Sequence, residues 1–199
     1  MRPILIVMLK EPRAGLVKTR LGRDIGMTNA AWWFRHQSRA LLRRLYAPRR
    51  WNIILAVAPD YTGLTSRAWP AHLPRIPQGQ GDLGVRMARL LRTFDRNPVC
   101  LIGGDIPGIS QRHVSQAFNT LGAQDAVFGP AEDGGFWLVG TGANATLPST
   151  MFQGVRWSTN HALDDSLATL PGKRIGFVDT LPDIDTIEDL AKFQPINRR

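Results

Sequence analysis

Apolar residues along this chain form two kinds of pattern, short continuous runs and longer periodic stretches. Residues 4–9 and 52–58 are nearly continuous apolar runs of strand length, which is typical of strands buried on both faces. Residues 83–94 place their apolar side chains at intervals of three and four, which predicts an amphipathic helix. The same patterns predict helices at 28–45, 110–121, 159–170 and from 186, and strands at 73–76, 99–102, 125–129, 136–140 and 175–178.

The order of these elements predicts the fold class. Strands that alternate with helices favour an α/β domain in which helices flank a mostly parallel sheet. The sequence contains no internal repeat or linker, so we expect a single domain over residues 1–199. Ligands of such sheets bind beyond the carboxyl ends of the strands. We therefore expect the chemistry in the loops after Leu9, Ile102 and Gly129.

Composition narrows the class further. The chain has 199 residues, of which 43% are hydrophobic and 21% charged, as in ordinary globular domains. No apolar stretch reaches the length of a membrane span. Cys100 is the single cysteine, which excludes an internal disulfide and a thiolate zinc cluster. We expect a cytoplasmic protein.

The net charge of +9 is concentrated near the amino terminus. Residues 1–50 contain twelve Lys and Arg and two acids, whereas residues 51–199 contain thirteen basic and fourteen acidic residues. A local excess of +10 beside a remainder of −1 is compatible with a surface that binds polyanions or with a site for a small phosphorylated ligand.

The loop that follows the first predicted strand favours the second possibility. Between Lys10 and Leu21 it carries four cations together with Pro12 and Gly15. Flexible backbone amides and cationic side chains together can hold phosphate oxygens. The loop is not a Walker A motif, because the glycine and Gly-Lys-Ser/Thr spacing is absent. A solvated basic turn is the alternative.

Two carboxylates follow later strands. Asp105 lies in Gly103–Gly108 after a strongly hydrophobic strand, where a carboxylate could hold Mg²⁺ together with phosphate oxygens. Its alternative role is to cap the turn. Asp133 precedes Gly134 and Gly135, whose missing side chains allow a ligand close to the backbone. Asp-Gly-Gly is also a good hairpin turn, and both roles are compatible.

Two further motifs are weaker by themselves. Asp183 and Asp185 match the short Asp-x-Asp pattern with which sugar transferases hold a metal and a diphosphate, but they could instead favour the positive end of the helix dipole. Residues 79–84 are a literal G-x-G-x-x-G, but prolines lie where the preceding strand should be, so we reject a nicotinamide site. The helix start there, with Gly81 and Asp82, could still line the same crevice.

Aromatic residues divide into two groups. Trp32 and Trp33 are expected to pack within their helix. Trp137 and Trp157 adjoin loops of the ligand type, and for both we favour core packing over stacking on a sugar or base. The four histidines show no metal-ligand spacing, and Cys100 is expected to be an inert buried thiol.

Six blocks in order resemble a known family. They are KEPRAGLVKTRL, QGQGDLGVRM, GGDIPG, GPAEDGGFWLVG, VRWST and DIDTIEDL. The chain resembles, from Ile4 to about Phe193, a bacterial family of A-type glycosyltransferase-like proteins once classed as a domain of unknown function, with members associated with arsenosugar biosynthesis. This family is similar to the nucleotide-diphospho-sugar transferase superfamily, which also includes nucleotidyltransferases such as phospholactate guanylyltransferase. The resemblance implies a GT-A fold, a three-layer sandwich around a mostly parallel sheet.

The resemblance also implies roles for individual residues. The first loop resembles the nucleotide phosphate-binding segment, and Asp105 the metal ligand at the end of its strand. Asp185 resembles a second metal carboxylate, although Asp183 remains an alternative. Asp133 resembles part of the acceptor-side loop and could orient or deprotonate the acceptor. The expected set is Asp133 and Lys18 for catalysis, Asp105 and Asp185 for the metal, and Gly15, Lys18, Thr19, Arg20, Gly81 and Asp82 for the nucleotide.

We therefore expect an enzyme that uses a nucleotide sugar with Mg²⁺ or Mn²⁺ to glycosylate a small acceptor. The alternative is a nucleotidyltransferase that joins an NTP to a phosphorylated small molecule and releases pyrophosphate. A third possibility is a basic nucleic-acid-binding domain, which we do not favour because exposed aromatics and recognition motifs are missing. It would use Arg35, Arg39, Arg43, Arg44, Arg49 and Arg50.

Overall fold

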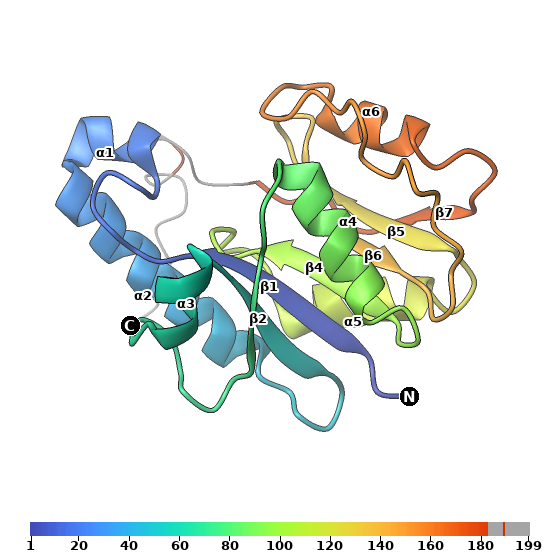
Figure 1. Cartoon of the computed structure of the whole chain (residues 1–199), viewed down its shortest axis with the longest axis horizontal. Coiled ribbons are helices and arrows are strands. Elements are labelled where there is room, and N and C mark those ends of the chain that lie inside the picture. The colour runs from blue at the N-terminus through green and yellow to red at the C-terminus, as the bar shows by residue number, and fades with distance from the viewer. Residues whose placement is uncertain (183–188, 190–199) are drawn as a thin grey trace, which may run out of the picture.

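The computed structural model describes residues 1–182 and Asp189, and its centre is a seven-stranded sheet (Figure 1). The strand order is β3-β2-β1-β4-β6-β5-β7, and β6 runs antiparallel to both of its neighbours while all other pairs are parallel. The predicted α/β fold with a mostly parallel sheet is confirmed. The strands are β1 (Ile4–Lys10), β2 (Asn52–Ala58), β3 (Arg75–Pro77), β4 (Val99–Gly103), β5 (Ala126–Pro130), β6 (Phe136–Thr141) and β7 (Ile175–Phe177).

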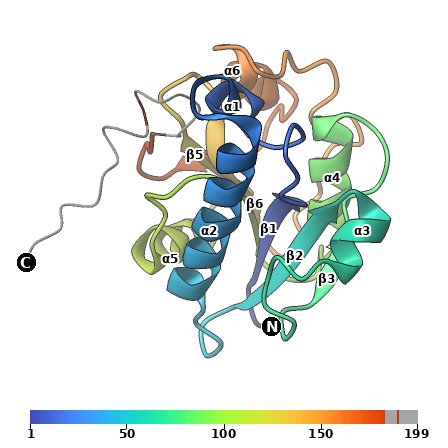
Figure 2. The same cartoon turned by 90° about the vertical axis from the view of Figure 1, so that its left-hand side faces the viewer.

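Helices cover both faces of the sheet, which gives the expected three layers. In Figure 2, α2 and α5 lie on one side of the sheet and α4 on the other. The described helices are α1 (Thr19–Ile25), α2 (Met27–Leu45), α3 (Asp60–Thr65), α4 (Leu83–Thr93), α5 (Gln111–Thr120) and α6 (Ala162–Ala168). None of them is long and apolar enough to cross a membrane.

The central strand β1 shows why the apolar runs are continuous. Side chains alternate across a strand, so Leu5 and Val7 pack into the core cluster beneath α2 and α5. Ile4 and Ile6 pack into the opposite cluster with α4 and α6. All four side chains are buried, each stabilising the fold by about 1.5–3 kcal/mol. A strand that is buried on both faces therefore shows no alternation of apolar and polar residues.

Several predicted boundaries differ from the structure. Helix α2 begins at Met27 after Gly26, one residue before the predicted start at Thr28. Helix α6 spans Ala162–Ala168 within the predicted 159–170. Helices α1 and α3 were not predicted, because each is only one or two turns long and too short to display a period. The predicted cap at Ser110 is confirmed, with its hydroxyl and the His113 side chain forming a capping box.

Candidate functional site

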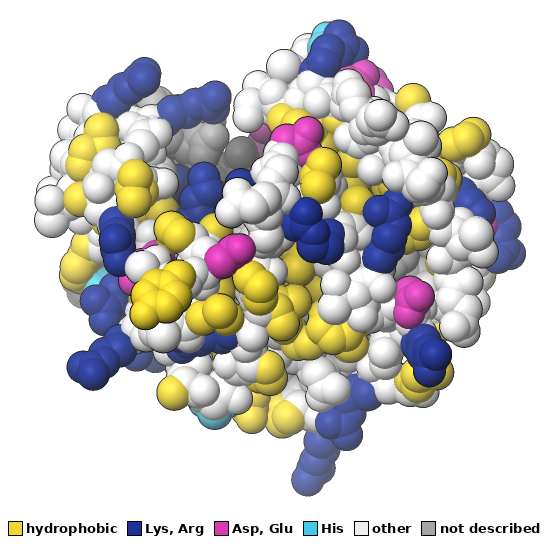
Figure 3. Space-filling model, viewed as in Figure 1, with side chains coloured by type: hydrophobic (Ala, Val, Ile, Leu, Met, Phe, Trp, Pro, Cys, Tyr) yellow, Lys and Arg dark blue, Asp and Glu magenta, His cyan; other side chains and the backbone are white. Residues whose placement is uncertain are grey.

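The edge of the sheet where β1, β4 and β5 end carries a cleft of about 620 Å³. The surface is visibly hollowed between the α1 end of the molecule and the α6 end (Figure 3). Because β6 runs antiparallel, its first residue, Phe136, lies at this same edge. Four separate segments supply most of the lining: residues 16–20, 103–106, 131–137 and 157–162, of which 132, 134, 160 and 161 do not line it. The loops expected to carry the chemistry therefore meet at one site.

The wall from residues 16–20 is cationic and is fixed by an unusual backbone conformation. Lys18 precedes α1 with φ 46° and ψ 47°, in the left-handed region that side chains other than glycine rarely adopt. Only 6% of the Lys18 side chain is exposed, and its Nζ lies 2.9 Å from Asp105 Oδ2. Strained residues of this kind cluster at functional sites. The predicted phosphate ligand and the predicted metal ligand therefore lie in direct contact.

Asp105 is held by a turn that has little freedom. A Cβ on Gly104 would lie 2.1 Å from Leu9 Cδ2, so only glycine fits there without movement. Arg44 of α2 closes the other side of the turn, donating from Nε to the Ile109 carbonyl at 2.6 Å and from Nη2 to the Pro107 carbonyl at 2.6 Å. Arg44 is thus a positioning residue for the Asp105 turn rather than part of a free basic surface.

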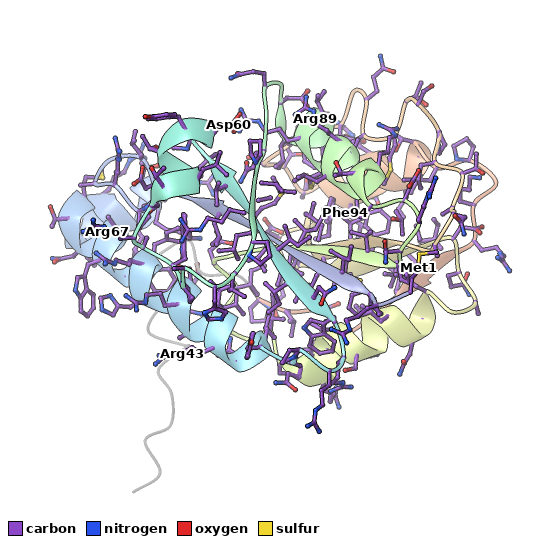
Figure 4. The ribbon with its side chains drawn as sticks, turned by 60° about the horizontal axis from the view of Figure 1, so that its bottom comes forward. Met1, Arg43, Asp60, Arg67, Arg89 and Phe94 are labelled. Carbon is purple, nitrogen blue, oxygen red and sulfur yellow. The ribbon has the colours of Figure 1, made fainter. Side chains whose placement is uncertain are left out.

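The arginines of the alternative nucleic-acid surface behave differently from one another. Arg50 also bonds inside the fold, to Ser115 Oγ, and lies over the Trp51 ring. Arg43 lies on the outer side of α2, as Figure 4 shows, and is exposed.

Trp32 is 63% exposed and its ring lies against that of His36, so its expected packing role was wrong. Trp32 lies on the side of α2 that carries the exposed arginines, away from the apolar stripe that packs into the core, so its ring faces solvent.

The turn between β5 and β6 is both a hairpin and a part of the cleft wall. Asp133 Oδ1 accepts a hydrogen bond from the Gly135 amide at 2.9 Å, as expected of a turn residue, and both residues line the cleft. Gly134 has φ 83°, and a Cβ there would lie 2.3 Å from the Asn160 carbonyl oxygen. Leu163 also donates its amide to the Gly134 carbonyl at 3.0 Å. Because residue 134 is glycine, this turn can pack directly against the backbone of Asn160, in the segment that precedes α6.

Two aromatic side chains form the wall above this turn. Phe136 and Trp157 line the cleft, with ring centroids 6.2 Å apart. Trp137 is 1% exposed and donates from Nε1 to the Asp179 carbonyl at 2.9 Å, so its predicted packing role is confirmed. Trp157 is only partly buried and has one side on the cleft.

The segment that carries Trp157 is held in place by an ion pair. Arg156 binds Asp165 in a bidentate manner, with Nε to Oδ2 and Nη2 to Oδ1 both 2.8 Å. The Arg156 amide adds a third bond at 3.1 Å. The hydrogen bonds from Arg156 hold the pKa of the Asp165 carboxyl well below its ordinary value. This pair links the segment before α6 to the helix itself.

Sequence reasoning missed one cleft residue for which a signal existed. Gln78 is 4% exposed, lines the cleft, and donates from Nε2 to the carbonyls of Leu9 at 3.2 Å and Ala56 at 2.9 Å. It directly follows β3 and precedes the glycine loop. Arg89 of α4 fixes this loop by donating to the Gln78 and Gln80 carbonyls, and Figure 4 labels it on that helix.

The remaining predicted site residues have different placements. Thr19 and Arg20 line the cleft beside Lys18. Gly15, Gly81 and Asp82 are not among the residues that line it; Asp82 caps α4 by accepting a hydrogen bond from the Val85 amide at 2.8 Å. Their contact with a nucleotide stays a prediction. Asp183, Asp185 and the helix predicted from Thr186 lie outside the described residues.

Asp105 is the residue of the cleft that was predicted to hold a divalent cation. Within residues 1–182 and Asp189, no cluster of three His, Cys, Asp or Glu side chains could ligate a metal. Asp105 offers its carboxylate oxygens, which are hard ligands, and 38% of its side chain is exposed. Mg²⁺ commonly takes one or two carboxylates and completes its shell with substrate phosphates and water. Asp105 therefore fits such an ion only together with a phosphorylated ligand.

The comparisons with known proteins agree with this architecture. The family model described as "Uncharacterized protein conserved in bacteria (DUF2064)" matches residues 41–159. A crystal structure from Desulfovibrio desulfuricans G20, of a "putative nucleotide-diphospho-sugar transferase", is 28% identical with a TM-score of 0.86, covering 100% of this chain and 89% of that one. No curated protein sequence matches the chain.

More distant structures share the fold. The 4-diphosphocytidyl-2C-methyl-D-erythritol synthase of Anaerococcus prevotii DSM 20548 is 13% identical with a TM-score of 0.59, covering 96% of each chain. CMP:2-keto-3-deoxy-manno-octonic acid synthetase in complex with CTP is 12% identical with a TM-score of 0.53, covering 96% of each chain. The fold of this chain is thus that of nucleotide-diphospho-sugar transferases.

Proposed function

The chain belongs to the bacterial family DUF2064, and from this premise we propose that it is a transferase that uses a nucleotide-diphospho-sugar and a divalent cation to glycosylate a small acceptor. The observation that carries the proposal is the contact between Lys18 and Asp105, 2.9 Å apart at the carboxyl edge of the sheet. A cation for phosphate and a carboxylate for a metal are the two charges that such a donor requires at one place.

The cationic wall would bind the diphosphate. The Lys18 ammonium is a point charge in this wall, and the Arg20 guanidinium can bind two phosphate oxygens at once. Thr19 lines the cleft between them and could add a hydroxyl. Lys18 would stabilise the negative charge that grows on the departing diphosphate, because it is buried and already directed into the site.

Asp105 would hold the divalent cation. Mg²⁺ or Mn²⁺ would supply Lewis-acid stabilisation of the leaving diphosphate when bound. Asp105 has its Oδ2 on Lys18, so the carboxylate is oriented before a ligand arrives. Asp185 is the second carboxylate that the resemblance implies, and its participation is a prediction.

The transfer step then needs one proton acceptor. The acceptor hydroxyl oxygen forms a bond to the anomeric carbon while the bond from that carbon to the diphosphate oxygen breaks, and the nucleoside diphosphate leaves with the electron pair. Asp133 lines the cleft and uses one oxygen for its own turn, so its other oxygen can orient the hydroxyl and accept the proton.

A nucleotidyltransferase is the second candidate, and the number of cations favours it. Lys10, Lys18 and Arg20 all line the cleft, enough positive charge for a triphosphate. In that reaction a phosphate oxygen of the acceptor attacks the α-phosphorus and pyrophosphate leaves. The same residues would hold the phosphates in either reaction.

One experiment separates the two reactions. The protein is incubated with Mg²⁺ or Mn²⁺ and either nucleoside triphosphates or nucleotide sugars, and nucleotide binding and released products are measured. We expect binding of a nucleotide sugar and release of a nucleoside diphosphate. Release of pyrophosphate would contradict glycosyl transfer and favour the second candidate. Duplex DNA serves as a control polyanion, and tight salt-sensitive binding to it would favour the basic surface instead.

Asp105 provides the matched variant for this test. We expect Asp105→Asn to abolish metal-dependent nucleotide binding while leaving the fold intact, as checked by far-UV circular dichroism. Asp24→Asn is the control, because Asp24 is exposed on α1 and does not line the cleft. Equal affinity of Asp105→Asn and Asp24→Asn in titration calorimetry would refute the role of Asp105.

A further inference from the structure

We propose that Phe136 and Trp157, whose ring planes are 68° apart, form a site where a ring of the acceptor stacks on one of them and meets the edge of the other, an inference that rests on the proposed transferase function. The acceptor class is a small cyclic molecule with one apolar ring face and a hydroxyl at its edge. Both side chains line the cleft, and both are only partly buried. Aromatic side chains combine a large apolar face with little rotamer freedom, which suits them to hold a flat ligand.

The aromatic wall is rigid before any ligand binds. Two further rings lie behind it: Phe128 is 5.2 Å from Phe136, and Phe152 is 5.9 Å from Trp157. Phe128 and Phe152 are almost completely buried, at 0% and 2% exposed. A Cβ on Gly84 of α4 would lie 2.9 Å from Trp157 Cζ2, so the helix packs directly against the indole. Binding of a ligand here would therefore lose little free energy to the ordering of these side chains.

The indole N–H of Trp157 differs from those of the three buried tryptophans. The indole N–H groups of Trp51, Trp69 and Trp137 donate to the Leu45 carbonyl, Ser38 Oγ and the Asp179 carbonyl, respectively. Trp157 Nε1 has no such bond to the part of the chain that the structure describes, and it is not among the buried unpartnered atoms. A Trp N–H that becomes buried usually needs a hydrogen-bond acceptor, so a ligand that covers Trp157 would have to supply one. An oxygen of a stacked ring is a suitable one.

The turn that follows Trp157 presents a second polar group. Ser158 has φ 61°, a left-handed conformation that is costly for serine and is kept only where the surroundings impose it. The Arg156 to Asp165 pair imposes it from one side, and Thr159 Oγ1 donates to the Arg156 carbonyl at 2.7 Å from the other. Ser158 and Thr159 both line the cleft. The Thr159 hydroxyl is thus used within the turn, and Ser158 is the polar residue that the turn adds to the lining of the cleft.

Charge separates this site from the nucleotide site. The cationic wall carries Lys18 and Arg20, and an anionic diphosphate belongs there. On the opposite side Asp133 is the charged residue among those that line the cleft between 131 and 162, so a neutral ring is favoured over another anion. Asp133 would then face a hydroxyl of the ring held by Phe136 and Trp157.

Saturation-transfer NMR on the full chain tests the site with four probes. Phenyl β-D-glucopyranoside has both an aromatic and a sugar ring, methyl β-D-glucopyranoside has the sugar ring, benzyl alcohol has the aromatic ring, and glycerol has none. We expect transfer to ring protons of the first probe, no transfer to glycerol, and the two single-ring probes to identify which ring stacks. Failure of every ring probe to bind would overturn the proposal.

Variants connect the signal to Trp157. We expect Trp157→Ala to weaken binding of the phenyl glucoside by about tenfold, and Trp157→Phe to restore most of it because the flat face remains. Trp32→Ala is the matched control, since Trp32 is an exposed tryptophan on α2 outside the cleft. Equal weakening in Trp157→Ala and Trp32→Ala, or none in either, would also overturn the proposal.

Nucleotide titration distinguishes this failure from failure of the proposed function. UDP, GDP, CDP and ADP are each titrated with Mg²⁺ into the unmodified protein and into Trp157→Ala. We expect the same nucleotide affinity in both. If nucleotides bind and ring probes do not, only the stacking site is refuted. If no nucleotide binds the unmodified protein, the transferase function is refuted first.

Discussion

The two walls of the cleft are built in opposite ways. The cationic wall comes from one short segment, residues 16–20, and its key residue, Lys18, has a left-handed backbone and pairs with Asp105. The aromatic wall is assembled from β6 and the segment before α6, with α4 and buried rings behind it. The chemistry of a segment that is contiguous in sequence can be predicted from its residue types. The chemistry of a wall assembled from distant segments depends on how their residues pack together.

The largest effect is expected where the aromatic wall is joined together. Gly134→Ala adds a Cβ within 2.3 to 2.7 Å of three Asn160 backbone atoms and forces alanine into φ 83°. We expect a loss of about 3 kcal/mol in the free energy of unfolding by urea. The turn would be pushed away from the segment that carries Trp157, while nucleotide affinity on the cationic wall would change little.

Gly172→Ala is the matched control for that variant. Gly172 has φ 71° but no atom within 4 Å of its Cβ position, so it isolates the backbone cost. We expect about 1 kcal/mol of destabilisation. If the two variants lost the same stability, the contact between Gly134 and Asn160 would contribute nothing, and the two walls would not differ as described.

The second test acts on the cationic wall alone. Lys18→Gln keeps a long polar side chain and the same left-handed backbone but removes the charge. A hydrogen bond to a charged group is worth about 1.5–3 kcal/mol, so we expect nucleotide affinity to fall roughly 10- to 100-fold in calorimetry. Binding of the ring probes should be unchanged.

Arg23→Gln is the control for Lys18→Gln. Arg23 lies exposed in the last turn of α1 and does not line the cleft. It removes one positive charge from the same helix, so any general effect of net charge appears in both variants. Equal loss of nucleotide affinity would mean that the site depends on the overall field and not on the contact between Lys18 and Asp105.

The difference between the walls also explains what the sequence could reveal. Lys18 and Asp105 were predicted from their loops, because a parallel sheet brings strand ends to one edge. The roles of Gly134 and Trp157 depend on contacts with Asn160, Phe136 and α4, and no local pattern encodes those contacts. Charge patterning groups Arg44 with the other arginines of the basic surface that we did not favour, because composition does not show which guanidinium bonds two carbonyls.

The strand pattern was more informative than the helix pattern. The apolar runs in β1 and β2 were located to within a residue, because a strand buried on both faces has no polar positions to obscure it. Helices α1 and α3 were missed, since seven and six residues give at most two turns of periodicity. Helix α1 matters most, because the left-handed Lys18 precedes it and directs the cationic wall into the cleft.

Arg44 provides a test of how the cationic wall is supported. Arg44→Ala removes two hydrogen bonds of 2.6 Å to the turn that follows Asp105. We expect about 2 kcal/mol of destabilisation and a few-fold loss of metal-dependent nucleotide affinity, because the carboxylate is less well fixed. The neighbouring Arg43→Ala is the control, since Arg43 is exposed on the outer side of α2 (Figure 4). An unchanged affinity in Arg44→Ala would show that the turn is rigid without it.

The smallest expected effect concerns the ion pair that holds the aromatic wall, and its pH dependence gives the test. Arg156 lowers the pKa of Asp165, so the pair stabilises the fold where the unfolded carboxyl is also ionised and loses that contribution as the pH falls below about 4. At neutral pH we expect Asp165→Asn to lower Tm by about 2 °C or less, because the pair is at the surface. The difference from the unmodified protein should be constant between about pH 7 and pH 5 and shrink in more acidic buffer. Asp164→Asn, at an exposed neighbouring carboxylate, controls for charge near the start of α6. A Tm difference for Asp165→Asn that grew on acidification would mean that Asp165 is not held ionised by Arg156, and the aromatic wall would then need another anchor.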